Sequence, residues 1–223
     1  MLSVVIPTLN AAAALPACLA ALAGEPVAEL LVADGGSGDG TERLAAAAGA
    51  RVVQVRPGRG PQQAAGAAAA RGTWLLFLHA DTRLAEGWRS AVAAYMAEPG
   101  NGGRAAHFSF ALDDQSQSAR RLERLVAWRC RRFALPYGDQ GLLLSRALYD
   151  KVGGYRSLPL MEDVDLVRRI GGRRLDPLPI AAITSAGRYR REGYVPRSLR
   201  NLCCLTLYFL GLPPRLLARL YGA

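Results

Sequence analysis

One acidic side chain of this sequence follows directly on a short apolar segment, where a metal ion or another ligand could be held. The segment Trp74–His79 is almost entirely apolar, and Ala80, Asp81 and Thr82 come after it. A short apolar run that stops at a polar cluster predicts a strand buried on both faces, as in a parallel sheet. Ligands of open α/β sheets bind at the carboxyl ends of the strands, so Asp81 is a candidate metal ligand. The alternative is that Asp81 only caps a helix or closes a turn.

Two further side chains lie at predicted strand ends. His79 precedes Asp81 by two residues and is either a second metal ligand or a histidine bonded to the backbone. Mg²⁺ and Mn²⁺ prefer oxygen ligands and are often held by one or two carboxylates together with substrate phosphates. Asp34 ends another apolar segment before the glycine-rich stretch Gly35–Gly40. Its carboxylate could accept hydrogen bonds from a base or a ribose, or the segment could be an ordinary strand-to-helix turn. The glycine spacing does not match the dinucleotide fingerprint.

A third acidic set opens a predicted helix. Glu162, Asp163 and Asp165 fall within four consecutive positions. Carboxylates are favoured at a helix N-terminus by the helix dipole, but three acids exceed what capping requires. One of them could therefore act as a general base that removes a proton from a hydroxyl.

Arginines supply candidate phosphate contacts. Arg188, Arg190 and Arg191 follow a predicted strand that ends at Thr184, and Arg59 lies in an earlier loop. Arginine recognises phosphate through its planar, forked guanidinium group. The alternative is a solvated basic surface.

Composition limits the class of protein. The 223 residues are 51% hydrophobic and 21% charged, so the chain is globular and large enough for one sizeable core. The net charge of +10 comes almost entirely from arginine and could serve nucleic acid, an anionic membrane surface or a phosphate-bearing ligand. The aromatic residues are few and are not interleaved with the basic ones, so we expect no nucleic acid partner.

The four cysteines indicate a reducing compartment. They show no CxxC spacing, so neither a zinc site nor a disulfide framework is expected. Cys203 and Cys204 lie in an apolar run, which predicts core packing for both. The first residues lack the basic region and cleavage site of a signal peptide, so we expect a cytoplasmic protein. The apolar run Leu202–Leu212 is too short to span a bilayer, which takes roughly 20 residues.

Strand and helix patterns alternate through the first half of the chain. This alternation predicts a mostly parallel, Rossmann-like α/β sheet flanked by helices. The predicted strands are Leu2–Pro7, Glu29–Ala33, Arg51–Val55 and Thr73–His79, and the predicted helices are Ala11–Ala23, Glu42–Ala48 (with Thr41 as its N-cap) and Pro61–Arg71.

The second half is less regular and ends in a predicted helical pair. No repeat or linker divides the chain, so we expect one domain over residues 1–223. The predicted strands are Gly103–Leu112 (with one solvated face), a short one reached through Gly138–Leu144, and Ile180–Thr184, and the predicted helices are Leu84–Ala97, Gln117–Phe133, Arg146–Val152, Met161–Ile170, Val195–Leu210 and Pro213–Tyr221.

Taken in order, five segments resemble the family 2 inverting glycosyltransferases with the A-type nucleotide-sugar fold. The segments are LSVVIPTLN, VADGGSGDGT, GRGPQQAAGAAAARGTWLLFLHADT, YGDQGLLLSR and GGYRSLPLMEDVDLVRR. Within the family the chain is most similar to a small bacterial branch, often labelled as linked to arsenosugar biosynthesis, whose metal motif reads LHADT in place of DADD. The resemblance extends over about residues 2–215.

The resemblance implies a nucleotide-diphosphate sugar as donor and a divalent cation, Mn²⁺ or Mg²⁺, as cofactor. It makes residues 1–100 the donor half, 101–193 the acceptor and catalytic half, and 194–223 a pair of C-terminal helices. Asp34 matches the acid that binds the base. Other positions matched to the nucleotide and diphosphate are Pro7, Thr8, Asn10, Arg59 and Gln63, with Arg188 and Arg191 in a basic motif that closes over the diphosphate.

The resemblance also implies the catalytic groups. Asp163 matches the general base, with Glu162 beside it, and Asp81 matches the last acid of the metal motif. Gly138, Asp139 and Gln140 match a loop on the acceptor side.

Three positions depart from the family pattern. His79 replaces the first acid of the metal motif, which leaves metal affinity and choice open. Tyr189 lies among the C-terminal arginines where relatives carry a tryptophan, and Ala11 replaces a common acidic residue.

The expected reaction is a metal-assisted single displacement at the anomeric carbon of the sugar. Two alternatives stay open at this point, a non-enzymatic anion- or nucleic-acid-binding protein and a sugar nucleotidyltransferase. The second usually carries a glycine-rich loop after its first strand, and Thr8–Ala14 contains no glycine.

The C-terminal stretch Pro196–Tyr221 mixes arginines with an apolar run. It could lie on the inner face of a membrane as an interfacial helix pair, which would suit a lipid-linked acceptor. A homodimer contact or a cover for the core is the alternative. The sequence does not identify the sugar, the base or the acceptor.

Overall fold

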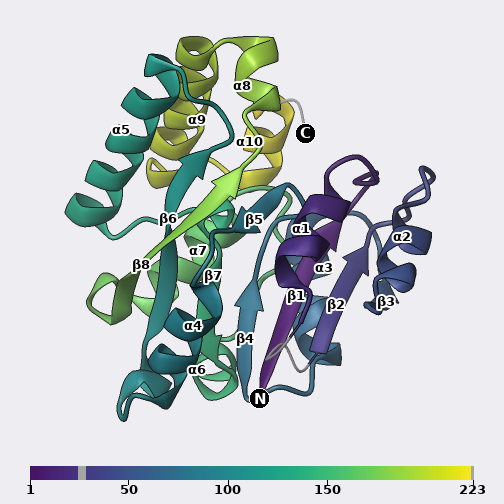
Figure 1. Ribbon diagram of the computed structural model, residues 1–223. Coiled ribbons are helices and arrows are strands. Elements are labelled where there is room, and N and C mark those ends of the chain that lie inside the picture. The colour runs from purple at the N-terminus through teal and green to yellow at the C-terminus, as the bar shows by residue number, and fades with distance from the viewer. Residues whose placement is uncertain (25–28, 222–223) are drawn as a thin grey trace.

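The structure, a computed structural model, describes residues 1–24 and 29–221 (Figure 1). Within these residues one eight-stranded sheet has the order β3-β2-β1-β4-β7-β6-β8-β5. The strands are β1 (Leu2–Thr8), β2 (Glu29–Asp34), β3 (Arg51–Gln54), β4 (Trp74–Phe77), β5 (Thr82–Leu84), β6 (Ala105–Leu112), β7 (Leu142–Ser145) and β8 (Leu175–Thr184).

The first four strands run parallel and are covered on both faces by helices. β1 pairs with β2 on one side and β4 on the other, and β2 pairs with β3. Val4 and Ile6 of β1 belong to one buried cluster and Val5 to another, as alternation along a strand between two helical layers requires. The helices between these strands are α1 (Leu15–Leu22), α2 (Thr41–Ala47) and α3 (Arg59–Ala69).

A glycine allows α3 to lie close against β1. A Cβ added at Gly66 would come within 2.3 Å of Cγ1 of Val5. This close approach fixes the position of α3 on the sheet, and the N-terminus of α3 therefore reaches the carboxyl end of β1.

The other strands make the sheet mixed. β7 runs antiparallel to β4 and β6, β8 runs parallel to β6, and β5 pairs antiparallel with β8. The predicted fold class, a mostly parallel α/β sheet with flanking helices and a C-terminal helical pair, is confirmed. The remaining helices are α4 (Trp88–Ala97), α5 (Gln117–Phe133), α6 (Arg146–Lys151), α7 (Glu162–Ile170), α8 (Gly187–Glu192), α9 (Tyr194–Phe209) and α10 (Pro214–Tyr221), with single 3₁₀ turns at Asn101–Gly103, Gly138–Gln140 and Gly172–Arg174.

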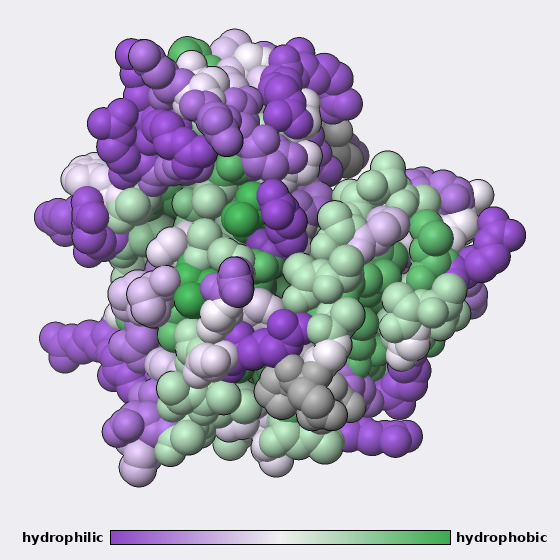
Figure 2. Space-filling view, viewed as in Figure 1, coloured by the Kyte–Doolittle hydropathy of each residue, from purple (hydrophilic) through white to green (hydrophobic). Residues whose placement is uncertain are grey.

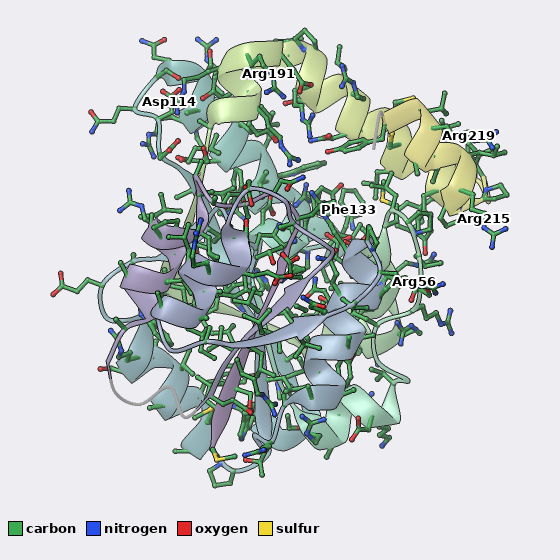
Figure 3. The ribbon with its side chains drawn as sticks, turned by 90° about the vertical axis from the view of Figure 1, so that its right-hand side faces the viewer. Arg56, Asp114, Phe133, Arg191, Arg215 and Arg219 are labelled. Atoms are coloured by element: carbon green, nitrogen blue, oxygen red, sulfur yellow. The ribbon has the colours of Figure 1, made fainter. Side chains whose placement is uncertain are left out.

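Helices α5, α8, α9 and α10 gather at the end of the molecule toward which β1, β2 and β4 point (Figure 1). On the face seen in Figure 2, hydrophilic side chains cover α5 and α8. Figure 3 shows Arg191 on α8, and Arg215 and Arg219 on α10, at the outer edge of this helical layer. No helix in residues 1–24 or 29–221 is both long enough and apolar enough to cross a membrane.

Several predicted boundaries of helices and strands were wrong because pairing with distant strands sets them. The predicted helix Leu84–Ala97 begins only at Trp88, because Thr82–Leu84 forms β5 against β8 and Gly87, with φ +83°, separates the two elements. The strand predicted from Ile180 starts earlier, at Leu175, since it pairs with β6. The expected solvated face of β6 is present only toward its end: Ser109 is exposed and Ala111 is half-buried, whereas Ala105 and His107 on the same face are buried.

Three local predictions also need correction. Helix α1 begins at Leu15 and not at Ala11. Gly40, with φ +88°, occupies the N-cap position of α2, whereas the Thr41 hydroxyl accepts from Ala11 N and donates to Asp39. Cys203 is exposed and only its neighbour Cys204 is buried, so core packing was wrong for Cys203.

Candidate active site

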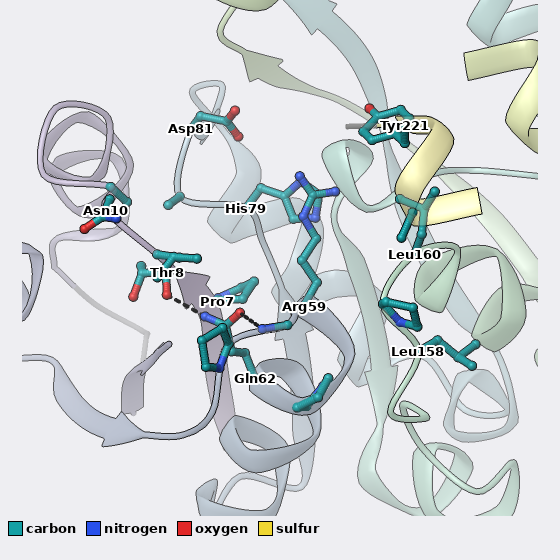
Figure 4. Close-up of a pocket in the computed structure, with 18 of the residues that line it drawn as sticks. Pro7, Thr8, Asn10, Arg59, Gln62, His79, Asp81, Leu158, Leu160 and Tyr221 are labelled. Atoms are coloured by element: carbon teal, nitrogen blue, oxygen red, sulfur yellow. Dashed lines mark hydrogen bonds between the residues drawn. The ribbon is translucent and has the colours of Figure 1, made fainter. Parts of the chain in front are cut away.

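Two adjoining cavities open beyond the carboxyl ends of β1 and β4 (Figure 4). The larger one, about 1070 Å³, is lined by the β1–α1 loop, the start of α3, the segment after β4, and α8 to α10. The smaller one, about 130 Å³, lies between the Gly138 turn and the start of α7. Both are bordered by Arg59, His79, Asp81, Arg188 and Tyr221, so a ligand in one cavity would face a ligand in the other.

The side chain of Asp34 connects the end of β1 to the glycine-rich loop that follows β2. Its carboxylate accepts hydrogen bonds from Thr8 Oγ1 (2.7 Å), Ser37 Oγ (2.6 Å), Ser37 N (2.7 Å) and Gly36 N (2.9 Å). Burial would raise the pKa of Asp34, but these hydrogen bonds lower it overall. The side chain is fully buried and is not among the described residues that line the cavity. In this structure Asp34 therefore shapes the loops and does not face the cavity.

Pro7, Thr8 and Asn10, which the resemblance matched to the nucleotide, line the larger cavity. Asn10 has a left-handed backbone, with φ +51°. Its main-chain N–H donates to Ser37 Oγ at 2.8 Å, and its side-chain Oδ1 accepts from Gly38 N at 3.0 Å. These bonds tie the β1–α1 loop to the glycine-rich loop.

Gln62, and not the predicted Gln63, reaches the cavity. Its Nε2 donates to the carbonyls of Thr8 (2.5 Å) and Ala33 (2.9 Å), and its Oε1 accepts from Gly58 N (3.2 Å). Gln63 is buried and does not line either cavity in the described chain. The missed signal is helical spacing, because Gln62 lies one turn before the glycine that packs on β1.

His79 and Asp81 stand at the junction of the two cavities (Figure 4). Nε2 of His79 is buried and has no hydrogen-bond partner among residues 1–24 and 29–221. Burial lowers the pKa of this imidazole and Arg59 lowers it further, against Asp81 and Asp163, so the ring is neutral near pH 7. A neutral imidazole with an unused nitrogen can act as a metal ligand.

The described chain contains no cluster of three His, Cys, Asp or Glu side chains that could enclose a metal ion. Mg²⁺ and Mn²⁺ nevertheless often take only one or two protein ligands and complete their shell with phosphate and water. The orphaned His79 nitrogen and the Asp81 carboxylate fit this kind of site. They do not fit a cation enclosed by protein ligands alone.

The acids that open α7 have different surroundings. Asp163 accepts the main-chain amides of Gly138, on Oδ2, and Val164, on Oδ1, both at 2.7 Å. Glu162 is buried, and its Oε2 has no partner in the described residues. Burial raises the pKa of Glu162, the nearby Asp163 raises it further, and Arg59 only partly offsets this. Asp165 instead binds Arg169 at 2.6 Å, which explains the third acid as an ion-pair partner.

The Gly138 turn places a glycine and an acid beside these groups. A Cβ at Gly138 would lie 2.5 Å from Nε2 of His79 and 3.4 Å from Oδ2 of Asp163, so only glycine fits here without a shift. Burial raises the pKa of Asp139 to about 6, against the opposing charge of Arg129. Gln140 is buried, donates to the Phe108 carbonyl at 3.0 Å and lines neither cavity in the described residues, so it supports the turn.

Arginines dominate the charge of the larger cavity. Arg59, Arg188 and Arg191, which the resemblance matched to the diphosphate, line it, and Arg59 and Arg188 also reach the smaller cavity. Burial lowers the pKa of Arg59, but the nearby carboxylates of Glu162 and Asp163 more than offset this, so the pKa is raised overall. Sequence reasoning missed the lining residues Arg56, Arg197, Arg200, Arg215 and Tyr221.

A hydrogen bond between α9 and α10 lies at the wall of the larger cavity. The buried Arg197 of α9 donates to the Tyr221 hydroxyl at 2.5 Å and pairs with Glu192 at 3.0 Å. Figure 4 shows Tyr221 opposite Asp81 across the cavity. The sequence predicted a helix at Pro213–Tyr221 but gave no sign of this contact.

Comparison with known proteins adds a family and a fold. Residues 3–157 match the model of the family described as glycosyl transferase family 2. Two curated relatives, both named PGL/p-HBAD biosynthesis glycosyltransferase, from Mycobacterium tuberculosis (strain ATCC 25177 / H37Ra) and Mycobacterium bovis (strain BCG / Pasteur 1173P2), are 44% identical over 108 residues. The match covers 44% of this chain and 42% of each relative, so it spans less than half of their length.

Two solved structures share the fold. Both are glucosyl-3-phosphoglycerate synthase from Mycobacterium tuberculosis, one with Mn²⁺ and UDP-glucose and one with Mn²⁺, UDP and phosphoglyceric acid. The first has a TM-score of 0.59 at 23% identity and the second 0.58 at 24%. Each match covers 81% of this chain and 69% of the solved chain.

Proposed function

Since this chain belongs to glycosyltransferase family 2, we propose that it moves a sugar from a nucleotide-diphosphate sugar to an acceptor hydroxyl in a single inverting displacement. Membership in this family sets aside both the non-enzymatic reading and the nucleotidyltransferase reading of the sequence. The observation that carries the proposal is the position of Asp163, which is held by the Gly138 amide in the wall of the smaller cavity. That wall adjoins the larger, arginine-lined cavity.

The larger cavity is assigned to the donor. Thr8 at the end of β1 and Asn10 in the β1–α1 loop border the space for the nucleoside, and Arg59 and Arg188 lie where the two cavities join. Arg59 and Arg188 offset the negative charge that builds on the departing diphosphate. Arg191, Arg197, Arg200 and Arg215 line the same cavity, so residues 194–221 share the donor site with the N-terminal half. Residues 222 and 223 of that segment lie outside the described chain.

The smaller cavity is assigned to the acceptor. Asp163 takes the proton of the acceptor hydroxyl, whose oxygen bonds to the anomeric carbon while the bond from that carbon to the diphosphate breaks on the opposite face. The two main-chain amides bound to Asp163 orient its carboxylate for this step. Glu162 keeps its proton more readily than a surface glutamate, which limits negative charge beside Asp163.

A divalent cation, Mn²⁺ or Mg²⁺, fits beside Asp81, with His79 as a second ligand. When bound it supplies positive charge next to the donor diphosphate. The synthase of the same fold was solved with Mn²⁺ and UDP-glucose, which makes UDP the first nucleotide to try. A cytoplasmic location, as the sequence predicts, would give the enzyme access to nucleotide sugars.

A donor screen tests this function. The purified chain with Mn²⁺ would be incubated with UDP-, GDP- and dTDP-sugars, and release of the nucleoside diphosphate would be followed. We expect release from one donor class, and none from that donor with Asp163→Asn. Any glycoside formed should have inverted configuration by NMR. Retention of configuration, or equal release by the variant, would overturn the assignment of Asp163.

A further inference from the structure

The net positive charge of the chain comes from one helical layer. Helices α5, α8, α9 and α10 carry 13 arginines and two glutamates, a net charge of +11. The whole chain carries +10, so all other residues together have a net charge of −1. The donor cavity uses several of these arginines, but six of the 13 lie on α5, of which no residue lines that cavity.

Helix α9 has an apolar stripe that faces solvent. Val195, Leu199, Leu202 and Leu210 are 69%, 60%, 58% and 78% exposed. Their spacing of four, three and eight residues puts them on one side of the helix, of which Leu210 is the C-cap, with Thr206 between the last two. Inward-facing residues of α9, among them Cys204 and Leu205, are buried. An apolar stripe turned outward on a helix that already has a buried side is unusual for a surface that faces only water.

The two neighbouring helices repeat this pattern. On α5, which packs against α9, Leu125 and Trp128 are exposed on the side away from the core. On α10, Leu216 and Leu220 are exposed, each directly after an arginine. Figure 3 shows those two arginines, at 215 and 219, at the outer edge of the molecule. Arginines therefore lie among the exposed apolar side chains of α5 and α10, and both of these helices contact α9 with its exposed leucine stripe.

We propose that the outer faces of α5, α9 and α10 bind the surface of an anionic phospholipid membrane. Leucine and tryptophan side chains would enter the boundary between headgroups and acyl chains, and the arginines would contact lipid phosphates. A second copy of the chain is a poorer occupant, since α5, α9 and α10 together carry a net charge of +9 and two such surfaces would repel each other. Nucleic acid would satisfy the arginines but leave the leucine stripe of α9 exposed.

Docking in this way would bring the active site to the lipid surface. Helix α9 also contributes Arg200 to the donor cavity and Asn201 to the acceptor cavity. An acceptor hydroxyl carried by a lipid or a lipid-linked molecule would then lie beside Asp163. This second step rests on the proposed transfer reaction, whereas the docking itself does not.

Vesicle sedimentation tests the docking. The full chain would be mixed with phosphatidylcholine vesicles, with and without phosphatidylglycerol, in the absence of any donor. We expect binding that requires phosphatidylglycerol, weakens with salt, and falls at least tenfold in the double variant Leu199→Gln/Leu202→Gln. The matched control is Leu44→Gln, which changes an exposed leucine on α2 and should bind as wild type does.

Several outcomes would overturn the docking proposal. They are sedimentation independent of phosphatidylglycerol, equal binding by the double variant, and concentration-dependent dimerisation that the double variant abolishes. Salt-sensitive binding to duplex DNA without vesicle binding would point to nucleic acid instead. Circular dichroism and nucleotide titration confirm that the double variant is folded.

The acceptor step has its own readout. Labelled donor sugar incubated with a bacterial membrane lipid extract should give label in the organic phase with wild type. The double variant should give much less, although it still releases nucleoside diphosphate from the donor. If wild type turns over no donor but still binds vesicles, the transfer reaction fails and the docking stands. If donor turns over but all product remains water-soluble, the lipid acceptor is wrong.

Discussion

The main-chain amide of Gly138 donates a hydrogen bond of 2.7 Å to Oδ2 of Asp163, which lies 25 residues later in the chain. The other carboxylate oxygen accepts the amide of Val164 at the same distance. Both oxygens of Asp163 are therefore oriented by backbone groups. A carboxylate held in this way keeps its direction toward the smaller cavity and retains lone pairs for a substrate proton.

Replacement of the Asp163 carboxylate should slow the transfer reaction and leave the binding of the donor nucleotide unchanged. We predict that Asp163→Asn lowers kcat by roughly 10²- to 10⁴-fold, the usual effect of losing a general base. The affinity for the nucleotide should stay within about twofold, because Asp163 does not line the larger cavity. Steady-state kinetics and calorimetric titration measure the two effects separately.

Asp165→Asn is the matched control for this variant. Asp165 pairs with Arg169 at 2.6 Å and with Arg156 at 3.2 Å, and it borders neither cavity in the described chain. Its replacement should lower the melting temperature and spare kcat. Loss of nucleotide binding in Asp163→Asn would show that the carboxylate supports the fold and not the reaction.

The Gly138 turn has no room for a side chain. We predict that Gly138→Ala lowers both kcat and stability, because its Cβ would lie 2.5 Å from Nε2 of His79. Overpacking of this kind typically costs about 1–3 kcal/mol. Gly103→Ala is the control, since a Cβ there meets no described atom within 4 Å. Urea unfolding and kcat would be measured for both, and equal behaviour of the two variants would refute the steric role.

Asp139 should make the fold less stable as pH rises. Its pKa is raised from 3.8 to about 6 because burial disfavours the charged form. The fold therefore binds this proton more tightly than the unfolded chain does, and its stabilising effect is complete below about pH 3.8 and is lost as pH rises through about 6. Asp139→Asn removes the cost of ionisation, so we predict that the variant is more stable than wild type near neutral pH by at most about 3 kcal/mol.

Urea unfolding of both proteins between mildly acidic and neutral pH tests this. The stability difference should grow with pH and level off above the pKa of Asp139. A difference that is constant across this range would mean that the carboxyl does not titrate in the fold. Lower activity in the more stable variant would be the expected trade between stability and function.

The end of β4 and the start of α7 could be predicted to within two residues because their signals are local. The apolar run before Asp81 and the acids at the start of α7 each identified a site element that the structure places at the cavities. The three-residue strand β5 could not be found, because it exists only through pairing with β8, about a hundred residues later. Its Thr82 hydroxyl lies 2.9 Å from that of Thr184.

The choice between neighbouring residues also depended on tertiary packing. Gln62 and Gln63 are equivalent in the sequence, and only the contact of Gly66 with Val5 sets which one faces the cavity. Asp34 was expected to face the nucleotide base, but its four hydrogen bonds within the loops bury it. Tyr221 was missed since nothing in a helix at the end of the chain indicates that it returns to the active site.

The central claim is a metal-assisted nucleotide-sugar site at Asp81, and calorimetric titration tests it most directly. UDP and then GDP would be titrated with and without Mn²⁺ into wild type, Asp81→Ala and the control Glu98→Ala, which changes an exposed acid after α4. We predict that one nucleotide binds wild type and the control only with Mn²⁺ and that Asp81→Ala loses this binding. Equal binding by Asp81→Ala, or binding that Mn²⁺ does not affect, would contradict it.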